Sequence, residues 1–288
     1  MLIVTAFAWA YVRFGSLPQV TGVLYGVKPV IIVIVLQALW SLGRAAIKTK
    51  WLALIALAGI ALTLAGVHEL LVLFGAGVIV GAGRLIARQI RSGHNSFIAI
   101  SALFLQASPA AAASFGLWPL FLFFLKVGSV LYGSGYVLLA FIRSDLVERW
   151  HWLTETQLLD AIAVGQVTPG PVFTTATFIG YVLGGTRGAL VATLGIFLPA
   201  FLFVAASGPL VPRIRRSPVA GAFLDGVNVA ALALMAVVSY QLGRAALIDV
   251  PTIIIALVSA IILFRFRVNS AWLIAGAAIL GWLLFGKA

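Results

Sequence analysis

The sequence predicts an all-α integral membrane protein, a polytopic helical bundle built from two homologous repeats of which the first is incomplete. Hydrophobic residues make up 63% of the chain and charged residues only 9%, and the mean hydropathy is +1.16. A soluble domain carries roughly 25% charged residues. The apolar residues form continuous runs close to the length of a spanning helix, about 20 residues, rather than the alternating segments of a membrane barrel. In addition, the sequence contains an internal repeat.

The repeat follows one fixed shift of 200 residues without gaps. The run Leu42-Gly43-Arg44-Ala45-Ala46 recurs as Leu242-Gly243-Arg244-Ala245-Ala246, and Pro18 falls on Pro218 and Gly26 on Gly226. In a membrane protein such a repeat indicates a transporter made of two related halves. Residues 116–200 have no earlier copy, so we expect that most of the first half is missing, as in a truncated gene.

We therefore divide the chain into a remnant of the first repeat (1–83), a linker (84–116) and a complete second repeat (117–288). The expected membrane segments are 22–42, 51–67, 69–83, 117–142, 187–207, 219–243, 250–264 and 270–286, with 97–114 a weaker candidate and 158–183 interrupted. Six or seven crossings then separate the two copies of the repeated motif. An odd number makes the repeats inverted, and an even number makes them parallel.

The net charge of +12 comes from short Arg and Lys clusters between the apolar runs. Such clusters are typical of cytoplasmic loops in membrane proteins, so the expected partner is the lipid bilayer and not nucleic acid. The chain has no Cys and three scattered His, so the sequence predicts no metal site and no cofactor. It also contains no nucleophile elbow or P-loop, and we do not expect an enzyme.

Residues 124–136 depart from the pattern of a lipid-facing helix. Lys126 interrupts an apolar run, where a charge costs at least about 2.5–3.5 kcal/mol at the bilayer centre. It either reaches back to the interface or serves a ligand. Gly133 and Gly135 follow and permit either tight helix packing or unwound backbone. The polar segment 143–152 comes next, and we expect it to be solvated at the headgroup level.

A broken helix is expected near Thr168–Pro171. Thr154 and Gln157 have the spacing of a capping box, and the helix that they start should run through Asp160. It then meets Thr168-Pro169-Gly170-Pro171, which cannot lie in an unbroken helix. The N-terminus of the next helix offers free N–H groups and a positive dipole end, which favour anions. The alternative is a proline-kinked helix with a structural role only.

Together these features predict an oxyanion site with donors from the helix break and charge from a lysine. Asp160 is the candidate for carrying a coupling proton, although an acid early in a helix also suits the dipole. The predicted substrate-binding residues are Lys126, Gly133, Gly135, Gln166, Thr168, Pro169, Gly170, Pro171, Thr174 and Thr175.

These residues also resemble the signature region of the chromate transporter family. The resemblance is carried by Phe124–Gly128, Tyr132–Val137, Val147–Arg149, Gly165–Pro171, Thr175–Tyr181, Gly195–Pro199 and Phe223–Asn228. It extends over essentially the whole chain, but most of the N-terminal half of the long family members is lacking. The resemblance implies a multi-pass protein of the bacterial inner (plasma) membrane that expels chromate, driven by proton-motive force, and confers chromate resistance. It also implies sulfate, a similar tetrahedral dianion, as a competitor.

Other functions stay open at this point. The chain can be a transporter of sulfate or a related anion, or a non-transporting half-subunit that needs a partner chain. It can also form a homo-oligomer. A membrane enzyme acting on lipid-like substrates is disfavoured, because the sequence shows no nucleophile–base pair.

Overall fold

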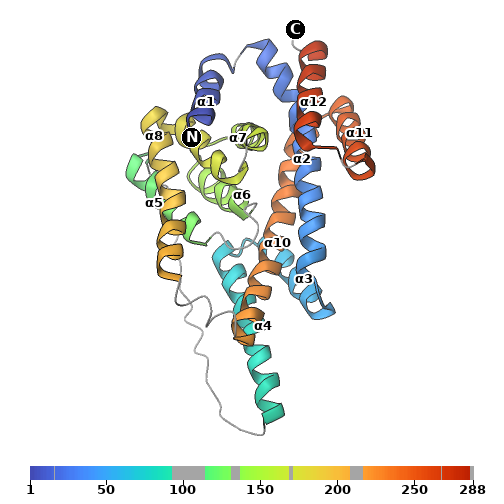
Figure 1. The fold of residues 1–288 in the computed structure, drawn as a ribbon. Helices are drawn as coiled ribbons and strands as arrows, with labels where there is room; N and C mark the ends of the chain where they lie inside the picture. The colour runs from blue at the N-terminus through green and yellow to red at the C-terminus, as the bar shows by residue number, and fades with distance from the viewer. Residues whose placement is uncertain are drawn as a thin grey trace.

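The computed structural model describes residues 1–15, 17–92, 114–130, 137–168, 171–207, 217–266 and 268–285. The elements within these ranges are helices (Figure 1), which confirms the predicted all-α class. They are α1 (Leu2–Phe14), α2 (Pro18–Ala46), α3 (Lys50–Leu64), α4 (Glu69–Ser92), α5 (Leu117–Val130), α6 (Val137–Phe141), the π-helix η1 (Ile142–Arg149), α7 (Glu155–Val167), α8 (Pro171–Ser207), α10 (Pro218–Ala246), α11 (Val250–Phe266) and α12 (Ser270–Phe285).

Four helical stretches in the described ranges are long and apolar enough to cross a membrane. They are Pro18–Ala46, Glu69–Arg88, Phe173–Ala206 and Pro218–Ala246. The third is two shorter helices, because α8 folds back at Gly184 and Gly185, where the backbone leaves helical geometry. A Cβ atom added at Gly180 would collide with the carbonyl oxygen of Gly188, a contact that a straight helix does not allow.

Three predicted spans form helices whose ends lie within three residues of the predicted ones. The runs 51–67, 250–264 and 270–286 form helices of 15, 17 and 16 residues, short of the usual spanning length of about 20. Hydropathy alone does not locate helix ends. The hydroxyl of Thr49 caps the start of α3, and the backbone turns soon after its end at Gly66, whose φ is +81°. The predicted linker is also helical at its start, because α4 continues to Ser92, whereas 93–113 lie outside the described residues.

Helices α2 and α10 form the centre of the molecule and obey the predicted repeat. Each has 29 residues, and their ends lie 200 positions apart. Gly43 of α2 faces Leu232 of α10, and Gly243 faces Ile32. Positions 32 and 232 are repeat equivalents, so the contact is reciprocal and the two helices run antiparallel. The two halves are therefore inverted with respect to each other, the arrangement of many secondary transporters.

The flanking helices of each half pack on the central helix of the other half. Figure 1 shows α3 and α4 beside α10, and α11 and α12 beside α2. Gly26 of α2 touches the backbone of α12 at Ala277 and Gly281, and Gly226 of α10 touches the backbone of α4 at Gly77. Small residues permit such close approach of membrane helices. Residues of the first half are therefore packed within the second half and do not form a separate body.

Two polar contacts lie at opposite ends of the α2–α10 pair. Each joins a residue near the start of one helix to a residue just after the end of the other. Lys48, after α2, lies 2.7 Å from the carboxylate of Asp225 near the start of α10. At the other end, Tyr25 near the start of α2 donates a hydrogen bond to Asp249, after α10. That phenol and the backbone N–H of Thr252 hold the pKa of Asp249 below its ordinary value. The symmetry of the halves thus extends to their polar ends.

Gly26→Ala is expected to lower the thermal stability of the protein in detergent. The new methyl group would meet the carbonyl oxygen of Ala277, and forcing extra atoms into a packed interface costs about 1–3 kcal/mol. The measurement is the temperature at which the monodisperse peak in size-exclusion chromatography is half lost. Gly276→Ala is the matched control, because its Cβ meets nothing within 4 Å. Equal midpoints for both variants would argue against close α2–α12 packing.

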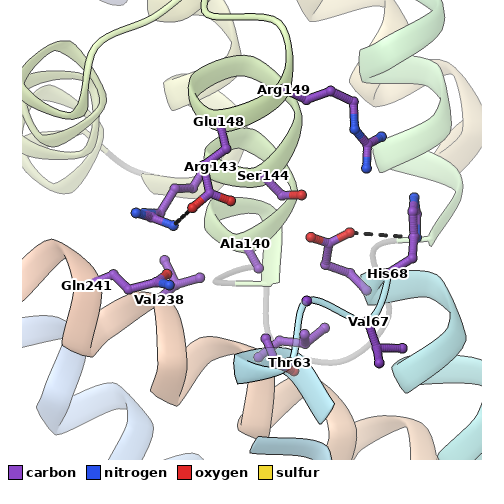
Figure 2. A pocket seen from close by; sticks show the side chains of 13 residues that line it. Thr63, Val67, His68, Ala140, Arg143, Ser144, Glu148, Arg149, Val238 and Gln241 are labelled. Atoms are coloured by element: carbon purple, nitrogen blue, oxygen red, sulfur yellow. Dashed lines mark hydrogen bonds and ion pairs between the residues drawn. The ribbon is translucent and has the colours of Figure 1, made fainter. Parts of the chain in front are cut away.

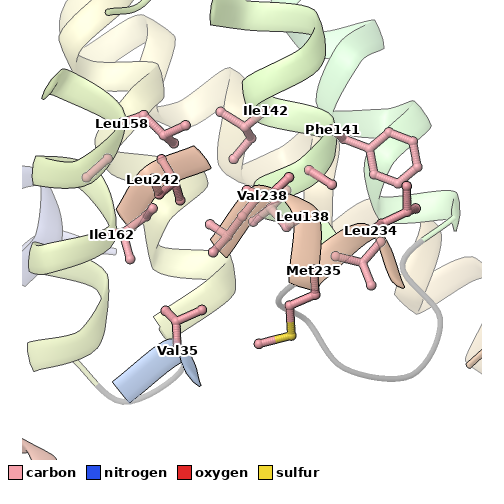
Figure 3. Close-up of a cluster of buried hydrophobic side chains, with 14 of the residues drawn as sticks. Val35, Leu138, Phe141, Ile142, Leu158, Ile162, Leu234, Met235, Val238 and Leu242 are labelled. Atoms are coloured by element: carbon pink, nitrogen blue, oxygen red, sulfur yellow. The ribbon is translucent and has the colours of Figure 1, made fainter. Parts of the chain in front are cut away.

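Helices α1 and α5 to α8 form a second group, which packs on α2 and α10 through α6 and α7. An apolar cluster joins the two groups (Figure 3). It contains Val35, Leu138, Phe141, Ile142, Leu158, Ile162, Leu234, Met235, Val238 and Leu242. This packing holds η1, which follows α6 directly, beside the C-terminal half of α10.

Candidate functional site

The helix is interrupted between α7 and α8, as predicted. Helix α7 begins at the capping box of Thr154 and Gln157, and α8 begins at Pro171. Between them, Thr168 has extended backbone angles (φ −103°, ψ 148°). Its hydroxyl oxygen lies 2.9 Å from that of Thr174, so hydroxyl groups meet across the break.

The remaining residues of the predicted site are only partly described. Gly133, Gly135, Pro169 and Gly170 lie outside the described residues. Pro171 is described by its backbone, as the first residue of α8. Gln166 belongs to α7 and Thr175 to α8, where Thr175 is fully buried. Of the predicted set, the structure therefore brings together Thr168 and Thr174.

Lys126 takes part in an ion-pair network with η1. Its Nζ lies 2.5 Å from Oδ2 of Asp145, and Nη1 of Arg149 lies 2.7 Å from Oδ1 of the same carboxylate. We call Lys126, Asp145 and Arg149 the η1 trio. Asp145 is only 1% exposed, and two cations compensate its burial. The expectation that the charges of segment 143–152 are solvated was therefore wrong for Asp145, which is buried inside η1, whereas Glu148 is 52% exposed.

A polar cavity of about 300 Å³ lies beside the trio (Figure 2). Its lining comes from η1, from the turn between α3 and α4, and from α10 with one residue of α6. The residues are Thr63, Gly66, Val67, His68, Glu69, Ala140, Arg143, Ser144, Glu148, Arg149, Leu234, Val238 and Gln241. The irregular α3–α4 turn thus lies against the C-terminal half of α10, a helix long and apolar enough to cross a membrane. Such backbone is tolerated at membrane depth where it lines a water-filled cavity.

The two sides of the cavity differ in charge. Arg143 binds two carboxylates, those of Glu148 and Glu155, the latter at 2.6 Å. Arg149 belongs to the η1 trio, in which two cations share one carboxylate. Figure 2 shows Arg149 and His68 on one side of the cavity and Arg143 on the other. Glu69 also lies on the side of Arg149, because it pairs with His68, so the two cations of the trio are matched there by two carboxylates. Arg149 is the cation of the trio that lines the cavity, and its guanidinium offers charged donors to an anion.

Asp160 lies in a different buried cluster. Its Oδ1 is 3.0 Å from Nζ of Lys28, and its Oδ2 accepts a hydrogen bond of 2.8 Å from the phenol of Tyr11. The aspartate is 2% exposed. This cluster ties α1 and α2 to α7 and so links the two helix groups.

Sequence reasoning missed the partners in both clusters. For Lys28 and Asp160 a signal existed, because each is a lone charge in an apolar run and such charges usually pair. For His68 and Arg149, which line the same cavity, no local signal existed, since their proximity depends on how distant helices pack. No group of three or more His, Cys, Asp or Glu residues suited to a metal ion occurs in the described ranges.

The chain is similar to known transport proteins over nearly its whole length. The profile of the family described as "Chromate transporter" matches residues 1–82 and 118–282. The chromate transport protein of Cupriavidus metallidurans is 35% identical, over 97% of this chain and 71% of its own. A probable chromate transport protein of Synechococcus elongatus is 33% identical, over 99% of this chain and 74% of its own. The uncharacterized transporter YwrA of Bacillus subtilis is 28% identical, over 57% of this chain and 95% of its own. No solved structure matches the chain.

Proposed function

Because this chain belongs to the chromate transporter family, we propose that it exports chromate across the bacterial inner membrane and thereby confers chromate resistance. The observation that carries the proposal is the polar cavity beside the η1 trio, against the C-terminal half of α10. A tetrahedral dianion needs positive charge and several convergent donors. The guanidinium of Arg149, the hydroxyl of Ser144 and the amide of Gln241 are the donors that we assign to it.

The inverted halves support a transport cycle in which the cavity opens to each side in turn. In transporters with inverted repeats, the substrate site lies near the bilayer midplane, at the interface between the repeats. Here α10 lines the cavity where it crosses the membrane beside α2. We propose proton-motive force as the energy source and sulfate as a competing substrate, since sulfate has the same shape and charge.

We also assign roles in chromate transport to the residues that the sequence predicted. Lys126 contributes its charge to the cavity through the η1 trio. The α7–α8 break, with Gln166, Thr168, Thr174 and Thr175, offers further donors along the path of the anion, and Asp160 is a candidate for the coupling proton.

Flux measurements test this function. Proteoliposomes containing the purified chain and loaded with chromate are expected to release it faster than protein-free vesicles when the membrane potential is negative inside. Sulfate added outside the vesicles tests whether the two anions share the carrier, because a shared carrier exchanges external sulfate for internal chromate. An absence of flux at both polarities would contradict transport by this chain.

A second candidate is a unit that transports only with a partner chain or as a homo-oligomer. It is favoured by one observation, that a half-length relative exists: the uncharacterized transporter YwrA of Bacillus subtilis matches 57% of this chain over 95% of its own length. Under this candidate, flux is absent with the chain alone and appears when a homologous half-length protein is reconstituted with it.

A further inference from the structure

We propose that the coupling proton binds in the same cavity as the oxyanion, on the His68–Glu69 pair, so that binding of a dianion is accompanied by proton uptake. This inference rests on the proposed function and names the residues that link the proton to the anion. It differs from the prediction made for Asp160, which lies in a separate cluster with Lys28 and Tyr11.

The first argument is the charge around the cavity. The ion pairs there contain more carboxylates than cations. The cations are Lys126, Arg143 and Arg149, and the carboxylates are Glu69, Asp145, Glu148 and Glu155. A dianion adds two negative charges to this cluster at membrane depth, where unbalanced charge is strongly unfavourable. Protonation of a nearby group reduces the imbalance and so favours binding.

The second argument concerns which group takes the proton. The other three carboxylates bind Lys or Arg, whereas Glu69 pairs with His68, with 3.6 Å between Oε2 and Nδ1. That Nδ1 also accepts a hydrogen bond from the backbone N–H of Leu70 at 3.2 Å, so in this geometry it does not donate to Glu69. Glu69 therefore has the weakest cationic partner of the four carboxylates, and we assign the proton to it.

The third argument is access. Both His68 and Glu69 line the cavity, and their side chains are 17% and 12% exposed. The charged groups that face them from η1 are Arg143, Glu148 and Arg149, and α10 presents the uncharged Gln241. A proton on this pair and an anion at Arg149 thus occupy the same cavity and respond to each other's charge.

Co-binding has a consequence for energy coupling. If one proton accompanies each dianion, one net negative charge leaves the cell per cycle. A membrane potential that is negative inside then drives export, with about 2.3 kcal/mol per 100 mV for each charge moved. The pH gradient acts against export, because the proton leaves with the anion. The electrical part of the proton-motive force is therefore the driving part.

The experiment measures chromate affinity against pH with the purified full chain in detergent, in the alkaline range where free chromate is a dianion. The wild-type Kd is expected to rise about tenfold per pH unit if one proton is taken up. A pH-indicator dye in weakly buffered solution should report about one proton taken up per chromate bound. Glu69→Gln, a neutral residue of the same shape, is expected to bind with a Kd that does not change with pH. Glu69→Asp should restore the slope.

Asp225→Asn is the matched control, because Asp225 pairs with Lys48 on the exterior and does not line the cavity. It should keep the wild-type slope. Chromate binding without proton uptake in the wild type would overturn this inference while leaving the proposed function intact. A slope that survives in Glu69→Gln and disappears in Asp160→Asn would overturn it in favour of the Lys28 cluster. A wild-type protein that binds no chromate contradicts the proposed function itself.

Discussion

Arg149→Gln is expected to lower chromate transport by about 10- to 150-fold, the effect of losing roughly 1.5–3 kcal/mol from a charged hydrogen bond of a partly exposed arginine. Arg149 lines the cavity and belongs to the η1 trio, whose two cations share the carboxylate of Asp145. Its removal takes from the cavity wall the cation that we assign to the anion. Initial rates of chromate release from proteoliposomes measure the effect.

Two comparison variants separate the role of Arg149 from a general loss of charge. Arg149→Lys keeps the charge but not the planar fork of donors, so an intermediate rate is expected. Arg244→Gln removes an exposed arginine from the last turn of α10 and should leave the rate within about twofold, as surface substitutions usually do. Wild-type transport by Arg149→Gln would remove this arginine from the anion site.

Asp145→Asn is expected to destabilise the protein by about 2–4 kcal/mol. Breaking a buried ion pair costs about 3–5 kcal/mol, and we lower that range because Lys126 and Arg149 are 35% and 34% exposed and solvent screens them in part. Two cations would then face each other without their shared carboxylate. Denaturant unfolding in detergent, followed by tryptophan fluorescence, measures the change.

A double-mutant cycle shows whether the trio acts as a unit. Lys126→Met alone leaves Asp145 paired with Arg149, so its cost should be smaller. The double variant Asp145→Asn/Lys126→Met should lose less stability than the two single losses combined, because it removes one of the two repelling cations. Glu148→Gln serves as a control, since Glu148 is 52% exposed and exposed pairs contribute little. Additive losses would show that the trio does not act as a unit.

The features that the sequence predicted correctly depend on local chemistry. The helix break was predictable because prolines at 169 and 171 remove backbone donors and clash with the preceding turn, whatever surrounds them. The start of α7 was predictable because Thr154 and Gln157 satisfy each other's backbone groups within one turn. Membrane character follows from composition, since so few charged residues cannot cover a soluble surface.

The features that were missed depend on contacts between distant segments. The expected segments 158–183 and 187–207 placed a boundary where α8 leaves helical geometry at Gly184 and Gly185, but the packing of the two arms against each other depends on tertiary structure. The burial of Asp145 was not predictable from a polar segment, because the cation of Lys126 that compensates it comes from another helix.

The sequence by itself determined the class of the protein, its internal repeat, the break before Pro171 and the resemblance to its family. Composition, fixed residue spacing and proline stereochemistry act within one chain segment. Only the tertiary structure decided that the halves are inverted, because counting crossings left six or seven open, whereas the contacts of Gly43 and Gly243 show antiparallel helices. It also decided the site. His68 and Arg149 line one cavity because the tertiary fold brings the α3–α4 turn and η1 together, and side-chain electrostatics depends on distance in space, not along the chain.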